Sequence, residues 1–151
     1  MTRLVVVLIV ALSLAGCRDL DVVTASYNTL SDATAAGAIA SGRMPDGVPP
    51  GATDLREAFN TETNARWGLF NFPVAEASHL KSTLEPGEMS LAGQSCNPPR
   101  RIEWWPVLLR GRLDPERVAT AGLQTYRSID GELIVLVNWK QGRAYYWSAR
   151  P

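Results

Sequence analysis

The residues best suited to nucleophilic chemistry are Cys96 and His79, which is the only histidine of the chain. Cys96 lies in the stretch Gly-Gln-Ser-Cys-Asn-Pro-Pro, which predicts a loop. A thiolate beside an imidazole can attack an electrophilic carbon, and Arg100 and Arg101 are close enough in sequence to lower the pKa of the thiol. One hypothesis is therefore a small hydrolase or thiol enzyme. The surrounding residues match no signature of a cysteine enzyme, so the sequence favours a small non-enzymatic domain for binding or scaffolding.

Other catalytic and metal-binding patterns have little support in the sequence. There is no Gly-x-Ser-x-Gly motif, so a serine triad has no basis. A single histidine excludes multi-histidine metal sites, and the polar turn of residues 60–64 lacks the spacing of a calcium-binding loop. We expect no metal and no cofactor. The 15 basic residues balance the 15 acidic ones, so the chain lacks the basic surface that nucleic-acid binding needs.

Two aromatic clusters in the C-terminal third support a second hypothesis. They are Trp104-Trp105 and Tyr145-Tyr146-Trp147. Neighbouring residues of a strand point to opposite faces of a sheet. One member of each cluster is therefore expected in the core, while the other could form a surface that binds an envelope protein or a glycan, such as a peptidoglycan fragment.

The N-terminal residues predict where the protein is found. Met1 and Arg3 form a basic start, Leu4–Leu14 is an apolar run, and Leu14-Ala15-Gly16-Cys17 follows directly. This run is shorter than the roughly 20 residues that a membrane-spanning helix needs. Its position before small residues is typical of a secretory signal.

The tetrapeptide that ends at Cys17 resembles the lipobox of bacterial lipoproteins. The resemblance implies cleavage before Cys17 and its acylation, for example with palmitate, on the sulfur and on the new amine. Several acyl chains anchor firmly, because each buried CH₂ contributes about 0.8 kcal/mol. The alternatives are an ordinary cleaved signal and an uncleaved N-terminal helix.

Arg18 takes the second position of the expected mature chain. By analogy with other bacterial lipoproteins, this favours the outer membrane over the inner one. We therefore expect a periplasm-facing protein of the cell envelope whose first partner is the membrane, reached through the lipid on Cys17.

The expected cleavage before Cys17 also sets the domain organisation. We expect residues 1–16 as the signal peptide, residues 17–24 as a short tether and residues 25–151 as a single domain. With Cys17 lipidated, Cys96 has no partner for a disulfide. A chain of this length buries enough surface to fold by packing alone.

The element pattern favours an α+β fold with an antiparallel sheet, a C-terminal β-meander and two to four short helices. Asp130-Gly131, between two β-rich runs, predicts a hairpin, and Asp54 with Glu57 reads as a capping box at a helix start. The expected strands are residues 21–28, 66–72, 123–129, 133–139 and 144–148. The expected helices are a segment from a cap at Thr29 or Ser31 through about Ser41, a short helix after Asp54, Val74–Leu84, and a helix that starts at Asp114-Pro115.

The stretch Ser41–Phe59 combines prolines and glycines with the start of one of these helices. Proline fixes its own φ and favours an extended residue before it. Met44-Pro45 and Val48-Pro49-Pro50 are therefore expected to be extended segments around a turn at Asp46-Gly47. We interpret the stretch mainly as a stiff connection between two helices.

This stretch also carries a resemblance to a family. The pattern is similar to that of small uncharacterised bacterial lipoproteins and to domains named after the YbbD head. Arg43 stands where that pattern has tryptophan, and Gly51 where it has serine. The resemblance implies no catalytic residue. The residues that carry it are Gly42-Arg43-Met44-Pro45, Val48-Pro49, Ala52, Asp54-Leu55, Asn60, Thr63-Asn64, Trp67, Phe70 and Phe72.

Overall fold

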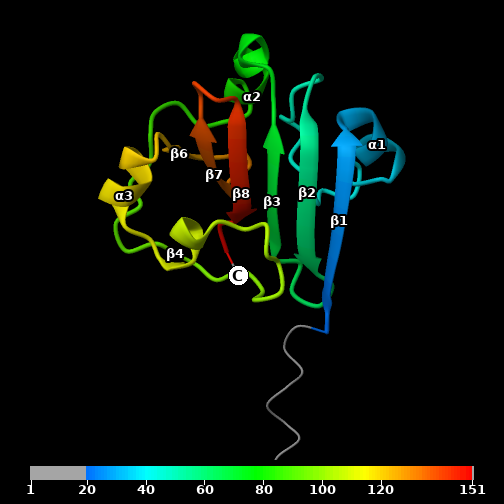
Figure 1. Cartoon of the computed structure of the whole chain (residues 1–151), viewed down its shortest axis with the longest axis horizontal. Helices are drawn as coiled ribbons and strands as arrows, with labels where there is room; N and C mark the ends of the chain where they lie inside the picture. The colour runs from blue at the N-terminus through cyan, green and yellow to red at the C-terminus, as the bar shows by residue number, and fades with distance from the viewer. Residues whose placement is uncertain (1–19, 151) are drawn as a thin grey trace, which may run out of the picture.

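A six-stranded antiparallel sheet organises residues 20–150, the part of the chain that the computed structural model describes (Figure 1). The expected signal peptide and Cys17 lie outside these residues. The strand order is β1-β2-β3-β8-β7-β6, and β4 and β5 form a separate two-stranded sheet. The main strands are β1 Val22–Thr29, β2 Thr53–Asn60, β3 Arg66–Asn71, β6 Gln124–Arg127, β7 Leu133–Asn138 and β8 Arg143–Ser148, with β4 Ser95–Cys96 and β5 Gly111–Arg112 beside them.

The helices of the described residues are short. They are α1 Leu30–Ala35, α2 Ala77–Lys81 and α3 Pro115–Thr120, with single 3₁₀ turns η2 Val74–Glu76 and η3 Val107–Leu109. The structure is thus a sheet-dominated α+β fold that ends in the expected meander of β6, β7 and β8. The strand β1 begins at Val22, inside the expected tether of residues 17–24.

Residues 53–60 correct the sequence prediction, because they form β2 and not a helix that starts at Asp54. Asp54 has a φ of 49° and sits where the pairing register between β2 and β3 shifts, as at a β-bulge. Glu57 does not reach back to cap a helix. Its carboxylate accepts a hydrogen bond from Tyr27 on the neighbouring strand. The Asp-x-x-Glu spacing therefore occurs here without a helix.

The first helix begins as predicted but ends earlier. Thr29 caps α1, and a capping box joins its side chain to Asp32. The helix stops at Ala35, and Gly37 adopts a φ of 77°, which turns the chain before the expected end near Ser41. The predicted helix Val74–Leu84 is likewise reduced to η2 and α2.

Both faces of the sheet are covered, and each cover has its own apolar cluster. On the face that we call the loop face, residues 36–52 and α2 pack on Leu55, Phe70 and Val135. On the opposite face, residues 89–123 pack on Ala58, Leu136 and Trp147. Since strand residues alternate between faces, the two clusters share a sheet but not side chains. β7 is covered on both of its faces, which explains why its residues are apolar except for Asn138.

Gly68 on β3 lets a tyrosine ring lie against the sheet. A Cβ at this position would lie 2.2 Å from the Oη and the Cζ of Tyr146. Tyr146 is fully buried and pairs with Gly68 across β3 and β8. A side chain at position 68 would therefore displace the ring from the core of the loop face.

We predict that Gly68→Ala lowers the free energy of unfolding by about 1–3 kcal/mol, because an added methyl group overpacks the site. Urea denaturation measures the loss. The double variant Gly68→Ala/Tyr146→Ala provides the control, since contacting residues have non-additive effects. Without the ring, the added methyl group should lower the free energy of unfolding much less. An equal loss in the presence and absence of the ring would contradict the close contact between Gly68 and Tyr146.

Candidate functional site

A cleft on the loop face, with a volume of about 310 Å³, is the candidate functional site. We call it the loop cleft. One wall is the turn of residues 42–47, and the other walls are residues 80–84 and 128–135. Buried apolar side chains line its inner part, and charged and hydroxyl side chains line its mouth. The inner residues are Met44, Leu80, Leu84, Leu133 and Val135, and the polar ones are Asp46, Arg66, Ser82, Thr83, Ser128 and Asp130.

The proline- and glycine-rich stretch forms its wall because of a few buried residues. Met44 and Val48 are buried in the core, and the backbone N–H of Met44 donates to the carbonyl of Ala38. Gly47 approaches the far wall so closely that a Cβ there would lie 2.0 Å from the Oγ1 of Thr83. The stretch is thus part of the core and one side of the cleft, beyond the connecting role that the sequence suggested.

A buried carboxylate holds this wall on the sheet. Glu57 on β2 is 1% exposed, and its Oε1 accepts a hydrogen bond of 2.8 Å from the hydroxyl of Tyr27. The same oxygen lies 3.4 Å from the Nε of Arg43, whose guanidinium also lies over the ring of Phe59. Tyr146 donates to the backbone carbonyl of Arg43 at 3.1 Å. Arg43 is therefore held by β2 and β8, and Tyr27 of β1 shares its carboxylate partner.

The two tyrosines of this cluster act as hydrogen-bond donors. Burial raises the pKa of Tyr27, and its hydrogen bond to Glu57 raises it further. Burial raises the pKa of Tyr146 well above its ordinary value, with a further contribution from the charge of Glu57. Both phenols are therefore protonated at neutral pH, which suits them to hold the wall in place.

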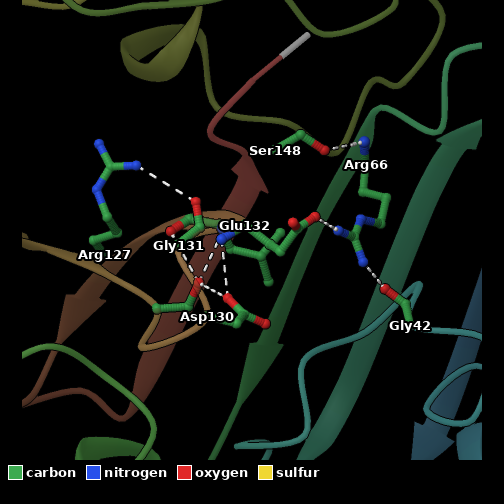
Figure 2. Close-up of polar contacts among 9 residues, drawn as sticks. Gly42, Arg66, Arg127, Asp130, Gly131, Glu132 and Ser148 are labelled. Carbon is green, nitrogen blue, oxygen red and sulfur yellow. Dashed lines mark hydrogen bonds and ion pairs between the residues drawn. The ribbon is translucent and has the colours of Figure 1, made fainter.

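The mouth of the cleft carries one cation between acceptors (Figure 2). Arg66 donates to the carbonyl of Gly42 and to the carboxylate of Glu132, the latter at 3.3 Å. Arg66 thus joins the 42–47 wall to the β6–β7 hairpin, and its buried Nε–H has no acceptor among the residues described.

Asp130 is the anion of the same hairpin. Its Oδ1 accepts from the hydroxyl of Ser128 at 2.5 Å and from the N–H of Glu132 at 2.9 Å. The hydrogen bond from Ser128 is the main cause that lowers the pKa of Asp130, and Arg66 contributes to it. Asp130 is therefore ionised at neutral pH. Beside it, Ile129 leaves 62% of its surface exposed on the rim of the cleft.

The hydroxyl groups of the cleft lack the partners that would activate a nucleophile. Ser82 and Thr83 donate to backbone carbonyls, and Ser128 donates to Asp130. Within the part of the chain that the structure describes, no three His, Cys, Asp or Glu side chains gather so as to hold a metal ion. The arrangement is suited to binding a small molecule with an apolar body and a polar head.

The structure separates Cys96 from His79 and so contradicts the hypothesis of a thiol dyad. Cys96 belongs to the cluster on the opposite face, whereas His79 is exposed on α2, on the loop face. Burial raises the pKa of Cys96 to about 12. A cavity of about 150 Å³ adjoins the cysteine, lined in part by Trp67 and Trp147. Neither residue has the environment of a catalytic group.

Most of the aromatic residues expected at a binding surface belong to the core. Trp105, Tyr146 and Trp147 are buried, while Trp104 and Tyr145 are half-buried. Trp105 lies at the centre of three edge-on contacts, with ring centroids 6.1–6.2 Å from Trp104, Tyr145 and Trp147. Three of the five residues therefore cannot form an exposed surface, and Trp104 and Tyr145 remain as candidates.

Comparison with known proteins bears on one wall of the cleft. Residues 21–71 match the YbbD head domain. The matched segment runs from β1 to β3 and contains Arg43, Glu57 and Arg66, so the expected resemblance is confirmed for this part of the chain. The walls at residues 80–84 and 128–135 lie beyond it. No curated protein and no solved structure matches the chain.

No helix within residues 20–150 has the length and the apolar character needed to cross a membrane.

We predict that the thiol of Cys96 reacts slowly with a disulfide reagent in the folded protein. Its pKa of about 12 leaves little thiolate below pH 9, and burial blocks access. A Cys17→Ser variant gives a single thiol, followed by absorbance with and without urea. Reaction should be fast only in urea. Fast reaction of the folded protein near pH 7 would contradict the burial.

Proposed function

We propose that this protein is a membrane-anchored envelope lipoprotein whose single domain binds a small ligand in the loop cleft without catalysing a reaction. The observation that carries the binding role is the cleft itself. Its volume of about 310 Å³ is at the lower end of the range typical of small-molecule sites.

The anchor is supported by the residues around Cys17. The apolar run and the Leu14-Ala15-Gly16-Cys17 tetrapeptide resemble a lipoprotein signal. Only residues 18–21 separate Cys17 from β1, so a lipid on Cys17 would hold the domain close to the bilayer. With Arg18 in the second mature position, the proposed location is the periplasmic face of the outer membrane.

The ligand class follows from the chemistry of the cleft. Met44, Leu80 and Leu133 offer an apolar inner surface. At the mouth, Arg66 can donate to an anionic or carbonyl oxygen, and Asp130 can accept from a hydroxyl or an amine. A compact molecule with an apolar body and a polar head satisfies both parts of the cleft.

A catalytic role has less support than binding. The only histidine is exposed on α2, and Cys96 is buried on the other face of the sheet. Arg66 and Asp130 are each already bonded to protein groups. Groups held in this way can orient a ligand, but none is placed to transfer a proton to a nucleophile.

The anchor predicts that the chain incorporates radiolabelled palmitate in a bacterial host that processes lipoproteins. Cys17→Ala should abolish the label, because it removes the acylated sulfur. Cys96→Ala, which removes the other cysteine, should keep it. A Cys17→Ala chain that remains labelled, or a parent chain that is never labelled, would contradict the anchor. Neither result would bear on ligand binding in the loop cleft.

For the cleft, we predict that the fluorescent probe 1-anilinonaphthalene-8-sulfonate binds the folded protein, because it combines an apolar body with an anionic head. Ser82→Phe should weaken binding on the order of tenfold, about 1.4 kcal/mol, by filling the mouth. Ser90→Phe is the matched control, since Ser90 is also exposed and lies outside the cleft. Equal loss in both variants, or loss in neither, would contradict binding in the cleft.

A further inference from the structure

The two edges of the main sheet differ in how their backbone groups are satisfied. Along the outer edge of β6, Glu85 and Met89 donate backbone hydrogen bonds to the carbonyls of Arg127 and Thr125, both at 2.8 Å. That edge is therefore closed by residues 85–89. The other edge is β1, which pairs with β2 alone (Figure 1).

The pairing pattern shows which groups of β1 point outward. Thr61 donates its N–H to the carbonyl of Asp21, so positions 21 and 61 form a hydrogen-bonded pair. In an antiparallel ladder such pairs recur at every second residue. The odd-numbered residues of β1 therefore bond to β2, and the N–H and C=O groups of Thr24, Ser26 and Asn28 point away from it.

These outward groups have no hydrogen-bond partner within residues 20–150. The one outward group of β1 that is bonded is the carbonyl of Val22, which accepts from the guanidinium of Arg101. Thr24, Ser26 and Asn28 are exposed, so no other segment of residues 20–150 covers them. A run of open backbone donors and acceptors remains along the middle of the strand.

The sequence of β1 does not protect this edge. Proteins usually block an edge strand with lysine, proline, a bulge or a covering segment. The eight residues Val-Val-Thr-Ala-Ser-Tyr-Asn-Thr contain no charge, no proline and no glycine. Val23, on the loop-face side of the strand, leaves 45% of its surface exposed. Such a strand is suited to accept another strand.

We propose that β1 pairs with β1 of a second copy of this chain, antiparallel and about a two-fold axis at Ser26. In this register Ser26 lies opposite Ser26 of the second copy, and Thr24 lies opposite Asn28 of the second copy. All three positions are outward-facing, so each pair exchanges two hydrogen bonds. Every open N–H and C=O of Thr24, Ser26 and Asn28 then has a partner.

The charges at the two ends of the strand favour a second copy over an unrelated strand. Arg101 places a cation at the start of β1, through its bond to Val22. Asp32, which caps α1 through Thr29, places an exposed anion just beyond the other end. Antiparallel pairing brings the cation of each copy toward the anion of the other. Val22–Thr29 itself carries no charge, so no like charges meet within the strand, while Asp21 precedes it at the same end as Arg101.

The same register covers the exposed apolar side chain. Val23 lies opposite Thr29 of the second copy, where α1 of that copy begins with Leu30. The side chains opposite one another on the other face are serine, threonine and asparagine, which can hydrogen-bond across the strands. The loop cleft contains no residue of β1, so this pairing leaves it open.

Cross-linking of the full chain in a mild detergent tests the register. Cα atoms of a hydrogen-bonded pair lie about 5.5 Å apart, within disulfide range. Mild oxidation should therefore join Ser26→Cys into a covalent dimer. Thr24→Cys alone should not form one, because the two substituted residues lie roughly 13 Å apart along the strands. An equal mixture of Thr24→Cys and Asn28→Cys chains should cross-link, and the parent chain should not.

Light scattering tests the association itself. The parent chain should have twice the monomer mass, and both Ser26→Lys and Ser26→Glu should be monomeric, because each places like charges together at the axis. Mixing these two variants should restore the dimer. Ser26 is exposed, so far-ultraviolet circular dichroism should show intact folds. A monomeric parent, a dimer that tolerates Ser26→Lys, or a strand of another protein bound to β1 would overturn the proposal.

Discussion

The buried carboxylate of Glu57 is the constraint on which the loop face depends. A carboxylate removed from water needs compensating partners, and loss of one partner typically costs several kcal/mol. Here the partners are Tyr27 from β1 and Arg43 from the irregular stretch. Arg43 must therefore lie over the sheet, and Met44, next in sequence, is drawn into the core. One wall of the loop cleft is the consequence.

The cleft also depends on contacts from outside the segment that resembles the YbbD head domain. Gly47 touches Thr83, and Arg66 joins Gly42 to Glu132 on the last hairpin. Two distant parts of the chain thus fix the width of the cleft. Because Arg66 and Asp130 are already bonded to protein atoms, less side-chain entropy is lost when a ligand binds between them.

The sequence predicts best those elements whose signals are local. The Asp130-Gly131 turn and the Asp114-Pro115 helix start are correct, because turn and cap preferences act within a few residues. The failure at Asp54 has a physical cause: an Asp-x-x-Glu spacing fits a capping box, but pairing of residues 53–60 with both neighbouring strands decides the structure. The cleft was not predicted, since residues 42–47, 80–84 and 128–135 meet only after folding.

The aromatic residues of β8 were expected at a surface, and their burial has a similar cause. Alternation along β8 correctly places Tyr146 and Tyr145 on different faces, but both faces of this sheet are covered. A strand in the middle of a doubly covered sheet has no free face, whereas β1 at its edge has open backbone groups. Beside the half-buried Trp104 and Tyr145, the loop cleft and the β1 edge are therefore the surfaces of the described residues that suit recognition. They lie on different strands, so a ligand and a second copy can bind without competing.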